Sequence, residues 1–234
     1  MDNRYGKNHN AIAACLGAIF LACFTLAMGK LGFGKPKKDP VKQIVQAPMY
    51  SNTVGRELAD FSQTDMYAYL SGRGFKIAAN MPLHEMRRMY LAYWYRPLFD
   101  SVSVRTGFSS DVLFAFFIME ATREGLESPM FSDTWNPGGV KYRGKYTPYY
   151  SYDDCFENGK AAPCAFENPG SFANAVALWS DVFNHPRYSA CKTDNITASC
   201  KCLEQAGYHT AKNHAQRARI AKSYRKYRKC FPGA

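Results

Sequence analysis

The chain contains 234 residues, of which 47% are hydrophobic, and its formal net charge is +11. A chain of this size can bury one substantial core and carry an appendage, but it is too short for two full domains. The large positive charge predicts an anionic partner, and the candidates are nucleic acid, an acidic membrane surface and an anionic cell-wall polymer. Charge alone does not choose among these three.

The first segments of the chain predict a membrane anchor and a linker. Residues 1–10 are polar, and residues 11–29 contain no charged side chain over about the minimum length that crosses a hydrocarbon core as a helix. We interpret the apolar run as an uncleaved transmembrane helix; a cleaved signal peptide and a lipoprotein signal modified at Cys23 are the alternatives. Residues 30–63 contain several lysines, and prolines that keep the chain extended, so they predict a linker to a domain over residues 64–230.

The eight cysteines indicate the compartment. Two lie in the apolar run, and six lie in the C-terminal third of the chain: Cys155, Cys164, Cys191, Cys200, Cys202 and Cys230. These six lack the paired CxxC spacing that is usual at zinc sites, so we predict disulfide bonds and no metal site. Disulfide bonds form in oxidising compartments, and we weigh this signal above the lysines that flank the apolar run and argue against export. The expected location is the inner (cytoplasmic) membrane, with a single pass and with the domain in the periplasm or outside.

The centre of the predicted domain is a helix over residues 109–120. Ser109 or Ser110 can cap its first turn, and no polar side chain occurs over residues 112–119. Such a helix belongs in a core, so Glu120 places a carboxyl group at the end of a buried helix. Poor solvation and the negative helix terminus both favour the protonated form of such a group, which is the form of a general acid. The alternative is that Glu120 only begins the polar end of a core helix.

A glycine-containing loop follows this helix. Asn136 and Pro137 mark a turn, and Gly138 and Gly139 permit backbone conformations that other residues avoid. Aromatic side chains in and after the loop suit the faces of sugar rings, or else they form the rim of a small core: Trp135, Tyr142, Tyr146, Tyr149 and Tyr150.

The next predicted element is a β-hairpin over residues 150–166, with its turn at Asn-Gly in positions 158–159. Cys155 and Cys164 lie on its opposite arms and could be joined. A bond between them would hold Asp153 and Asp154 near the glycine loop.

Helical periodicity also extends over residues 81–95, 171–183 and 211–227, and Pro97 closes or bends the first of these helices. The last helix carries basic side chains that we expect on its solvated face: Arg217, Arg219, Lys222, Arg225 and Lys226. Basic helices also bind nucleic acid, but no nucleic-acid motif accompanies this one, so we predict no nucleic-acid partner. The charge suits an anionic wall or lipid surface.

The order of these features resembles glycoside hydrolase family 73, the bacterial endo-β-N-acetylglucosaminidases of autolysins and flagellar hydrolases. The family motifs are similar to A-x-x-x-x-E-S, N-N-x-F-G-I-K and A-G-Y-A-T-D-P-x-Y. Here they correspond to the helix ending in Glu120, to NPGGVK at residues 136–141 and to AGYHT at residues 206–210. The resemblance covers about residues 99–227. The Trp-Gly pair that usually follows the glutamate is absent, and three other positions differ: Ala121 replaces Ser, Gly138 a bulky aromatic and Ala211 an Asp.

The resemblance implies a mainly α (α+β) fold, in which a lysozyme-like catalytic domain with a small β-hairpin lobe follows the transmembrane helix. It implies a peptidoglycan hydrolase without a cofactor that cleaves the β-1,4 bond after N-acetylglucosamine. Glu120 would be the general acid, Asp154 or next Asp153 the second carboxyl group, and Tyr208 would orient the sugar or its N-acetyl group. The expected substrate-binding residues are Trp135, Asn136, Gly139, Lys141, Tyr142 and Tyr149.

Two alternatives to this function stay open. A muramidase or lytic transglycosylase also relies on one glutamate at the end of a core helix. A non-catalytic wall-binding component of an envelope-spanning secretion or conjugation complex, or of a virion, would keep the fold without turnover. The expected partners are peptidoglycan glycan strands and, through the N-terminal helix, the membrane.

Overall fold

The computed structural model describes residues 51–151, 156–157, 160–161, 164–208 and 213–234. The predicted membrane anchor at residues 11–29 and the first part of the predicted linker lie outside these ranges. Over the ranges that are described, no helix combines the length and the apolar character needed to cross a membrane.

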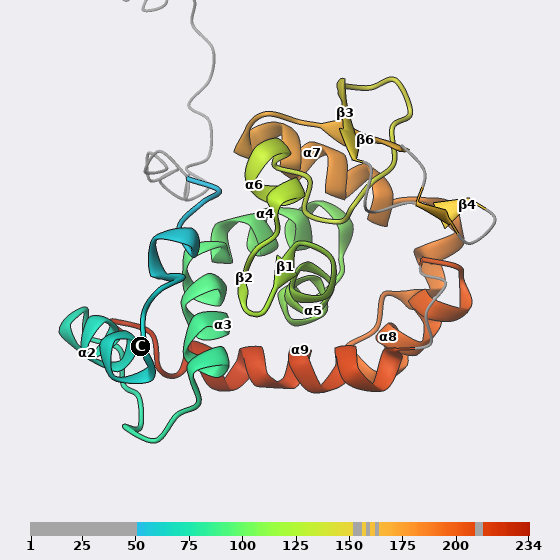
Figure 1. The fold of residues 1–234 in the computed structure, drawn as a ribbon. Helices are drawn as coiled ribbons and strands as arrows, with labels where there is room; N and C mark the ends of the chain where they lie inside the picture. Colours follow the sequence, from blue (N-terminus) through green and yellow to red (C-terminus); the bar gives the residue numbers. More distant parts are fainter. Residues whose placement is uncertain (1–50, 152–155, 158–159, 162–163, 209–212) are drawn as a thin grey trace, which may run out of the picture. The chain divides into compact units, whose positions relative to one another are not determined.

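The described part of the chain is mainly helical, as predicted (Figure 1). Its helices are α2 (Gln63–Gly72), α3 (Leu83–Trp94), α4 (Arg96–Thr106), α5 (Ser110–Glu120), α6 (Pro129–Thr134), α7 (Phe172–Phe183), α8 (Ile196–Gln205) and α9 (His214–Arg228), with the 3₁₀ helices η1 (Arg56–Leu58) and η2 (Pro186–Cys191). The helical content agrees with the mainly α part of the predicted fold class.

Short antiparallel strand pairs accompany the helices. They are β1 (Thr122–Arg123) with β2 (Leu126–Glu127), β3 (Thr147–Ser151) with β6 (Cys164–Asn168), and β4 (Phe156–Glu157) with β5 (Lys160–Ala161). In the last pair Phe156 is opposite Ala161 and Glu157 is opposite Lys160, which confirms the hairpin predicted around residues 158–159. We call β3 and β6, together with β4 and β5 that lie between them in the sequence, the β lobe.

Helix α5 lies in the core, as its apolar sequence predicts. The Ser109 side chain caps it by accepting a hydrogen bond from the Val112 amide at 3.3 Å. All residues from Asp111 to Ile118 are buried, and the helix packs against α4, α8 and α9. The buried carboxylate of Asp111 is paired with Arg225 and Arg228 of α9. The helix therefore carries Glu120 out of the core at its C-terminal end.

Helix α4 is an element that the sequence analysis did not separate from its neighbour. Pro97 does close the predicted helix, which ends as α3 at Trp94, but it also lies in the first turn of α4. Proline suits a first helical turn because its missing N–H has no partner there in any case. Gly107, with φ of +79°, ends α4 and leads into α5.

Residues 51–63 belong to the folded unit, although the predicted linker extends to residue 63. Val54 and Leu58 are buried in the core. The buried Glu127 carboxylate accepts hydrogen bonds from the Gly55 amide at 2.8 and 2.9 Å and from the Tyr95 hydroxyl at 2.7 Å. Burial raises the pKa of Glu127 above its ordinary value. These contacts tie residues 51–63 to the domain.

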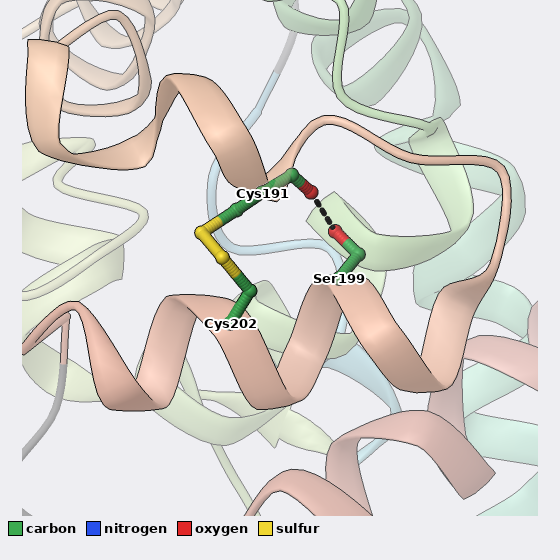
Figure 2. The surroundings of a disulfide bond; sticks show 3 residues. All are labelled: Cys191, Ser199 and Cys202. Carbon is green, nitrogen blue, oxygen red and sulfur yellow. Dashed lines mark hydrogen bonds between the residues drawn. A yellow bond between two sulfur atoms is a disulfide. The ribbon is translucent and has the colours of Figure 1, made fainter.

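The cysteines divide into bonded and free. Cys191 at the end of η2 is joined to Cys202 of α8, and Ser199 of α8 donates a hydrogen bond to the Cys191 carbonyl at 2.8 Å (Figure 2). Cys164 is disulfide-bonded, while Cys155 lies outside the described residues. The prediction is wrong for Cys200 and Cys230, which are free thiols.

Helix geometry explains why Cys200 is not bonded. Residues two apart on a helix point in different directions. Cys200 is therefore turned into the core, and it is Cys202 that faces η2.

Candidate active site

Glu120 lies between two hollows in the surface of the domain. Its side chain is 18% exposed, at the last residue of α5. One hollow has a volume of about 420 Å³ and the other about 400 Å³, and Glu120 lines both. We call them the β-lobe hollow and the Tyr208 hollow, after the residues that form their walls.

The β-lobe hollow is built from elements that are close in the sequence. Its wall comes from β1, the start of α6 and β3: Met119, Glu120, Thr122, Arg123, Ser128, Pro129, Met130, Tyr149 and Ser151. Tyr149 donates a hydrogen bond from its hydroxyl to Asp133 at 3.3 Å in an exposed position.

The Tyr208 hollow is built from segments that are far apart in the sequence. The glycine loop, the end of α7, η2 and the turn after α8 supply its wall: Glu120, Gly138, Gly139, Val140, Lys141, Arg143, Val182, Arg187, Tyr188 and Tyr208. Residues of all three motifs that carry the family resemblance therefore meet around one hollow.

Tyr208 is held firmly in this wall. Its hydroxyl accepts a hydrogen bond from the Trp179 ring N–H at 3.2 Å, and its ring stacks on Phe183 with centroids 5.1 Å apart. Burial raises the pKa of Tyr208, and the negative charge of Glu120 raises it further. The phenol is therefore neutral near pH 7 and lies close enough to Glu120 to feel its charge.

Arg217 is the residue beside Glu120 that the sequence analysis missed. We expected it on the solvated face of α9, but its side chain is only 2% exposed. Its guanidinium donates to a Glu120 oxygen at 3.4 Å and lies 4.9 Å from the Phe116 ring centroid. The spacing of Arg217 with the buried residues Ala221 and Tyr224 places it on the apolar face of α9, and this spacing was the available signal.

The glycine loop is shaped from within by Asn136, which is fully buried. Its side-chain amide donates to the carbonyls of Val140 at 2.9 Å and Glu167 at 3.0 Å, and its carbonyl accepts from the Val140 amide at 2.9 Å. Both the nitrogen and the oxygen of the Asn136 carboxamide thus form hydrogen bonds with backbone groups. This placement fits a residue that fixes the shape of the loop.

Gly138 explains one departure from the family pattern. A Cβ atom at this position would lie 2.7 Å from the Trp179 ring nitrogen and 3.1 Å from the Tyr208 hydroxyl oxygen. The bond between these two side chains occupies the space that a larger residue would need. Its neighbour Gly139 has φ of +57°, which favours glycine.

The other predicted site residues are distributed as follows. Gly139 and Lys141 line the Tyr208 hollow, and Tyr149 lines the β-lobe hollow. Trp135 is buried among Tyr95, Phe131 and Phe172, and Tyr142 is 42% exposed and lines neither hollow. Asp153 and Asp154 lie outside the described residues. Among those that are described, no group of three His, Cys, Asp or Glu side chains could hold a metal ion.

Comparison with known proteins yields structural matches only. No protein-family model and no curated protein matches the chain. A peptidoglycan hydrolase from Sphingomonas sp. A1 superposes with a TM-score of 0.48 at 18% identity, over 60% of this chain and 92% of that one. A mutant of a peptidoglycan hydrolase from the same organism gives 0.45 at 20% identity, over 61% and 98%. A truncated glycoside hydrolase domain of Salmonella typhimurium FlgJ gives 0.36 at 19% identity, over 72% and 99%. At these scores, function has to be argued from the site itself.

Proposed function

We propose that the chain is a peptidoglycan hydrolase that cleaves the β-1,4 bond after N-acetylglucosamine, with Glu120 as the general acid. The observation that carries this proposal is the meeting of Glu120, Lys141 and Tyr208, from three separate motifs, around one hollow. A second hollow that Glu120 also lines offers room for the polymer to continue beyond the bond that is cleaved.

The geometry around Glu120 suits proton transfer to a departing sugar oxygen. The carboxyl group is partly exposed at the boundary of the two hollows, so it can reach a bond that lies across both. Hydrolysis of a glycosidic bond needs such a proton, together with a group that stabilises positive charge on the sugar. Arg217 acts as a positioning residue, because its buried guanidinium restricts the orientations of the Glu120 side chain.

Tyr208 and a second carboxyl group complete the proposed machinery. The neutral Tyr208 hydroxyl can donate a hydrogen bond to the sugar or to its N-acetyl group. For the second carboxyl group we propose Asp154, with Asp153 next. In the sequence they lie two and three residues after Ser151, which ends β3 and lines the β-lobe hollow.

We also propose where the enzyme is located in the cell. Residues 11–29 would anchor the chain in the inner membrane, and the domain would meet peptidoglycan strands on the outer side, alone or within an envelope-spanning complex. The bonded cysteines support an oxidising compartment.

The test is release of soluble fragments from purified sacculi by the wild type and by Glu120→Gln. We expect the substitution to lower the rate by about 10²–10⁴-fold, the usual contribution of a general acid, without changing the unfolding midpoint. Glu124→Gln is the matched control, because Glu124 is exposed and lines neither hollow. Full activity of Glu120→Gln would refute the assignment. Binding to sacculi without release by the wild type would favour the non-catalytic alternative.

A further inference from the structure

The two hollows beside Glu120 differ in charge. Lys141, Arg143 and Arg187 line the Tyr208 hollow, whereas Arg123 is the cation among the lining residues of the β-lobe hollow. Glu120 belongs to both walls and is paired with Arg217. The Tyr208 hollow is therefore the side that attracts an anion.

Two of these cations, Arg187 and Arg143, act electrostatically on the same phenol, Tyr188. The Arg187 guanidinium lies 4.6 Å from the centroid of the Tyr188 ring. Burial raises the pKa of Tyr188, and the positive charges of Arg187 and Arg143 both act against that rise. Arg143 comes from the loop after β-bridge residue Lys141 and Arg187 from η2, so the fold brings together two charges that are distant in the sequence.

Neither guanidinium has an acidic partner in the part of the chain that the structure describes. Their neighbour Lys145, on the same loop as Arg143, is paired with Asp181. Two like charges held around one site repel each other unless an anion lies between them. Carboxylates and phosphates suit such a pair of arginines, because arginine can donate two parallel hydrogen bonds to either. Of these two, the carboxylate is the anion that peptidoglycan strands carry on their sugar substituents.

The backbone segments that carry Arg143 and Arg187 are both held in place. The amide of Arg143 donates to the buried Glu167 carboxylate at 2.7 Å, and this carboxylate also accepts from the amides of Lys145 and Tyr146. Helix η2, which carries Arg187, is fastened to α8 by the Cys191–Cys202 bond (Figure 2). The exposed side chains thus project from two rigid supports into the same hollow.

We propose that Arg143 and Arg187 form a subsite for a carboxylate carried on the glycan strand, on the Tyr208 side of the bond that Glu120 cleaves. This inference rests on the proposed function. Peptidoglycan strands carry carboxylates on the substituent of every second sugar, either in the lactyl group or in the attached peptide. The subsite would place the substituted sugar beside Tyr208 and so fix which of the two alternating bonds meets Glu120.

The test compares Arg143→Gln, Arg187→Gln and their double variant on soluble peptidoglycan strands and on the same strands after chemical amidation of their carboxyl groups. We expect the double variant to lose about tenfold in kcat/KM on native strands, mainly through KM, and to match the wild type on amidated strands. Arg219→Gln, an exposed change on α9 that lines neither hollow, should behave as the wild type on both. Removal of the peptides frees the lactyl carboxylate, which is bound as an amide while the peptide is attached. A vanished loss on such strands therefore assigns the peptide carboxylate, and a persistent loss shows that the subsite also accepts the lactyl carboxylate.

Two outcomes would overturn the subsite. Equal losses on native and amidated strands would indicate a structural role, and no loss on either would leave the arginines without a role in binding.

A binding measurement distinguishes failure of the carboxylate subsite from failure of the proposed hydrolase function. Cosedimentation of Glu120→Gln with native and amidated sacculi needs no turnover. The subsite predicts tighter binding to native sacculi and loss of this preference when Arg143→Gln and Arg187→Gln are added. If the wild type releases no fragments but this preference is present, the hydrolase assignment fails and the subsite stands.

Discussion

The two hollows beside Glu120 are assembled in different ways. The wall of the β-lobe hollow comes from residues 119–151, so contacts between neighbouring elements suffice to form it. The wall of the Tyr208 hollow joins segments between residues 120 and 208. A separate interaction holds each of the glycine loop, η2 and Tyr208 in place. Asn136 shapes the glycine loop, the Cys191–Cys202 bond fastens η2, and Trp179 holds Tyr208. Substitutions that remove these interactions should therefore disturb the Tyr208 hollow without disturbing the β-lobe hollow.

Removing the Cys191–Cys202 bond should have the largest effect on stability. The bond closes a loop with a sequence separation of 11, for which chain entropy predicts a loss of about 3 kcal/mol in the free energy of unfolding. Denaturant unfolding of the Cys191→Ala, Cys202→Ala double variant measures this loss. We also expect a higher KM, because Arg187 and Tyr188 lie on the released segment. Unchanged KM in a folded double variant would show that η2 holds its place without the bond.

Gly138→Ala should have a smaller effect on stability and a local effect on activity. The added Cβ would meet the Trp179 ring nitrogen at 2.7 Å, and overpacking of this kind costs about 1–3 kcal/mol. Gly72→Ala is the control, because a Cβ at that position in α2 meets nothing within 4 Å. Thermal unfolding and sacculus hydrolysis measure both effects, and full activity of Gly138→Ala would show that the loop adjusts freely.

Glu127, which is bonded to Gly55 and Tyr95, should give the smallest effect, a pH dependence of stability. Burial raises its pKa in the folded protein, so the folded state binds its proton more tightly than the unfolded state. The contribution of Glu127 to stability is therefore full below the ordinary carboxyl pKa, and it falls as pH rises through the higher folded pKa, by at most about 1.4 kcal/mol per pH unit. The free energy of unfolding of the wild type, minus that of Glu127→Gln, should decrease as pH rises above the ordinary carboxyl pKa of about 4. A constant or increasing difference would contradict this account.

Local signals predicted the parts of the fold that depend on local structure. The apolar run with Ser109 before it predicted α5, and Asn-Gly at residues 158–159 predicted the hairpin. The order of three motifs predicted that Glu120 and Tyr208 act at one site, and both line the Tyr208 hollow. Each of these features depends on backbone propensity or on a short motif.

Features that depend on packing between distant segments were missed. Arg217 was assigned to solvent because its charge was weighed above its spacing, yet α9 packs on α5 and buries it. The number of cysteines predicted disulfides, but it could not show that Cys200 faces the core while Cys202 faces η2. The meeting of Arg143 and Arg187 in the wall of one hollow likewise arises from tertiary structure alone.

The most direct test of the central claim is mass spectrometry of the fragments that the wild type releases from sacculi, after reduction of their reducing ends. Cleavage after N-acetylglucosamine with Glu120 as the acid predicts fragments that end in reduced N-acetylglucosamine, and release of these fragments about 10²–10⁴-fold more slowly by Glu120→Gln. Fragments that end in reduced N-acetylmuramic acid or in an anhydro sugar would contradict the proposed bond and assign the site to a muramidase or a lytic transglycosylase.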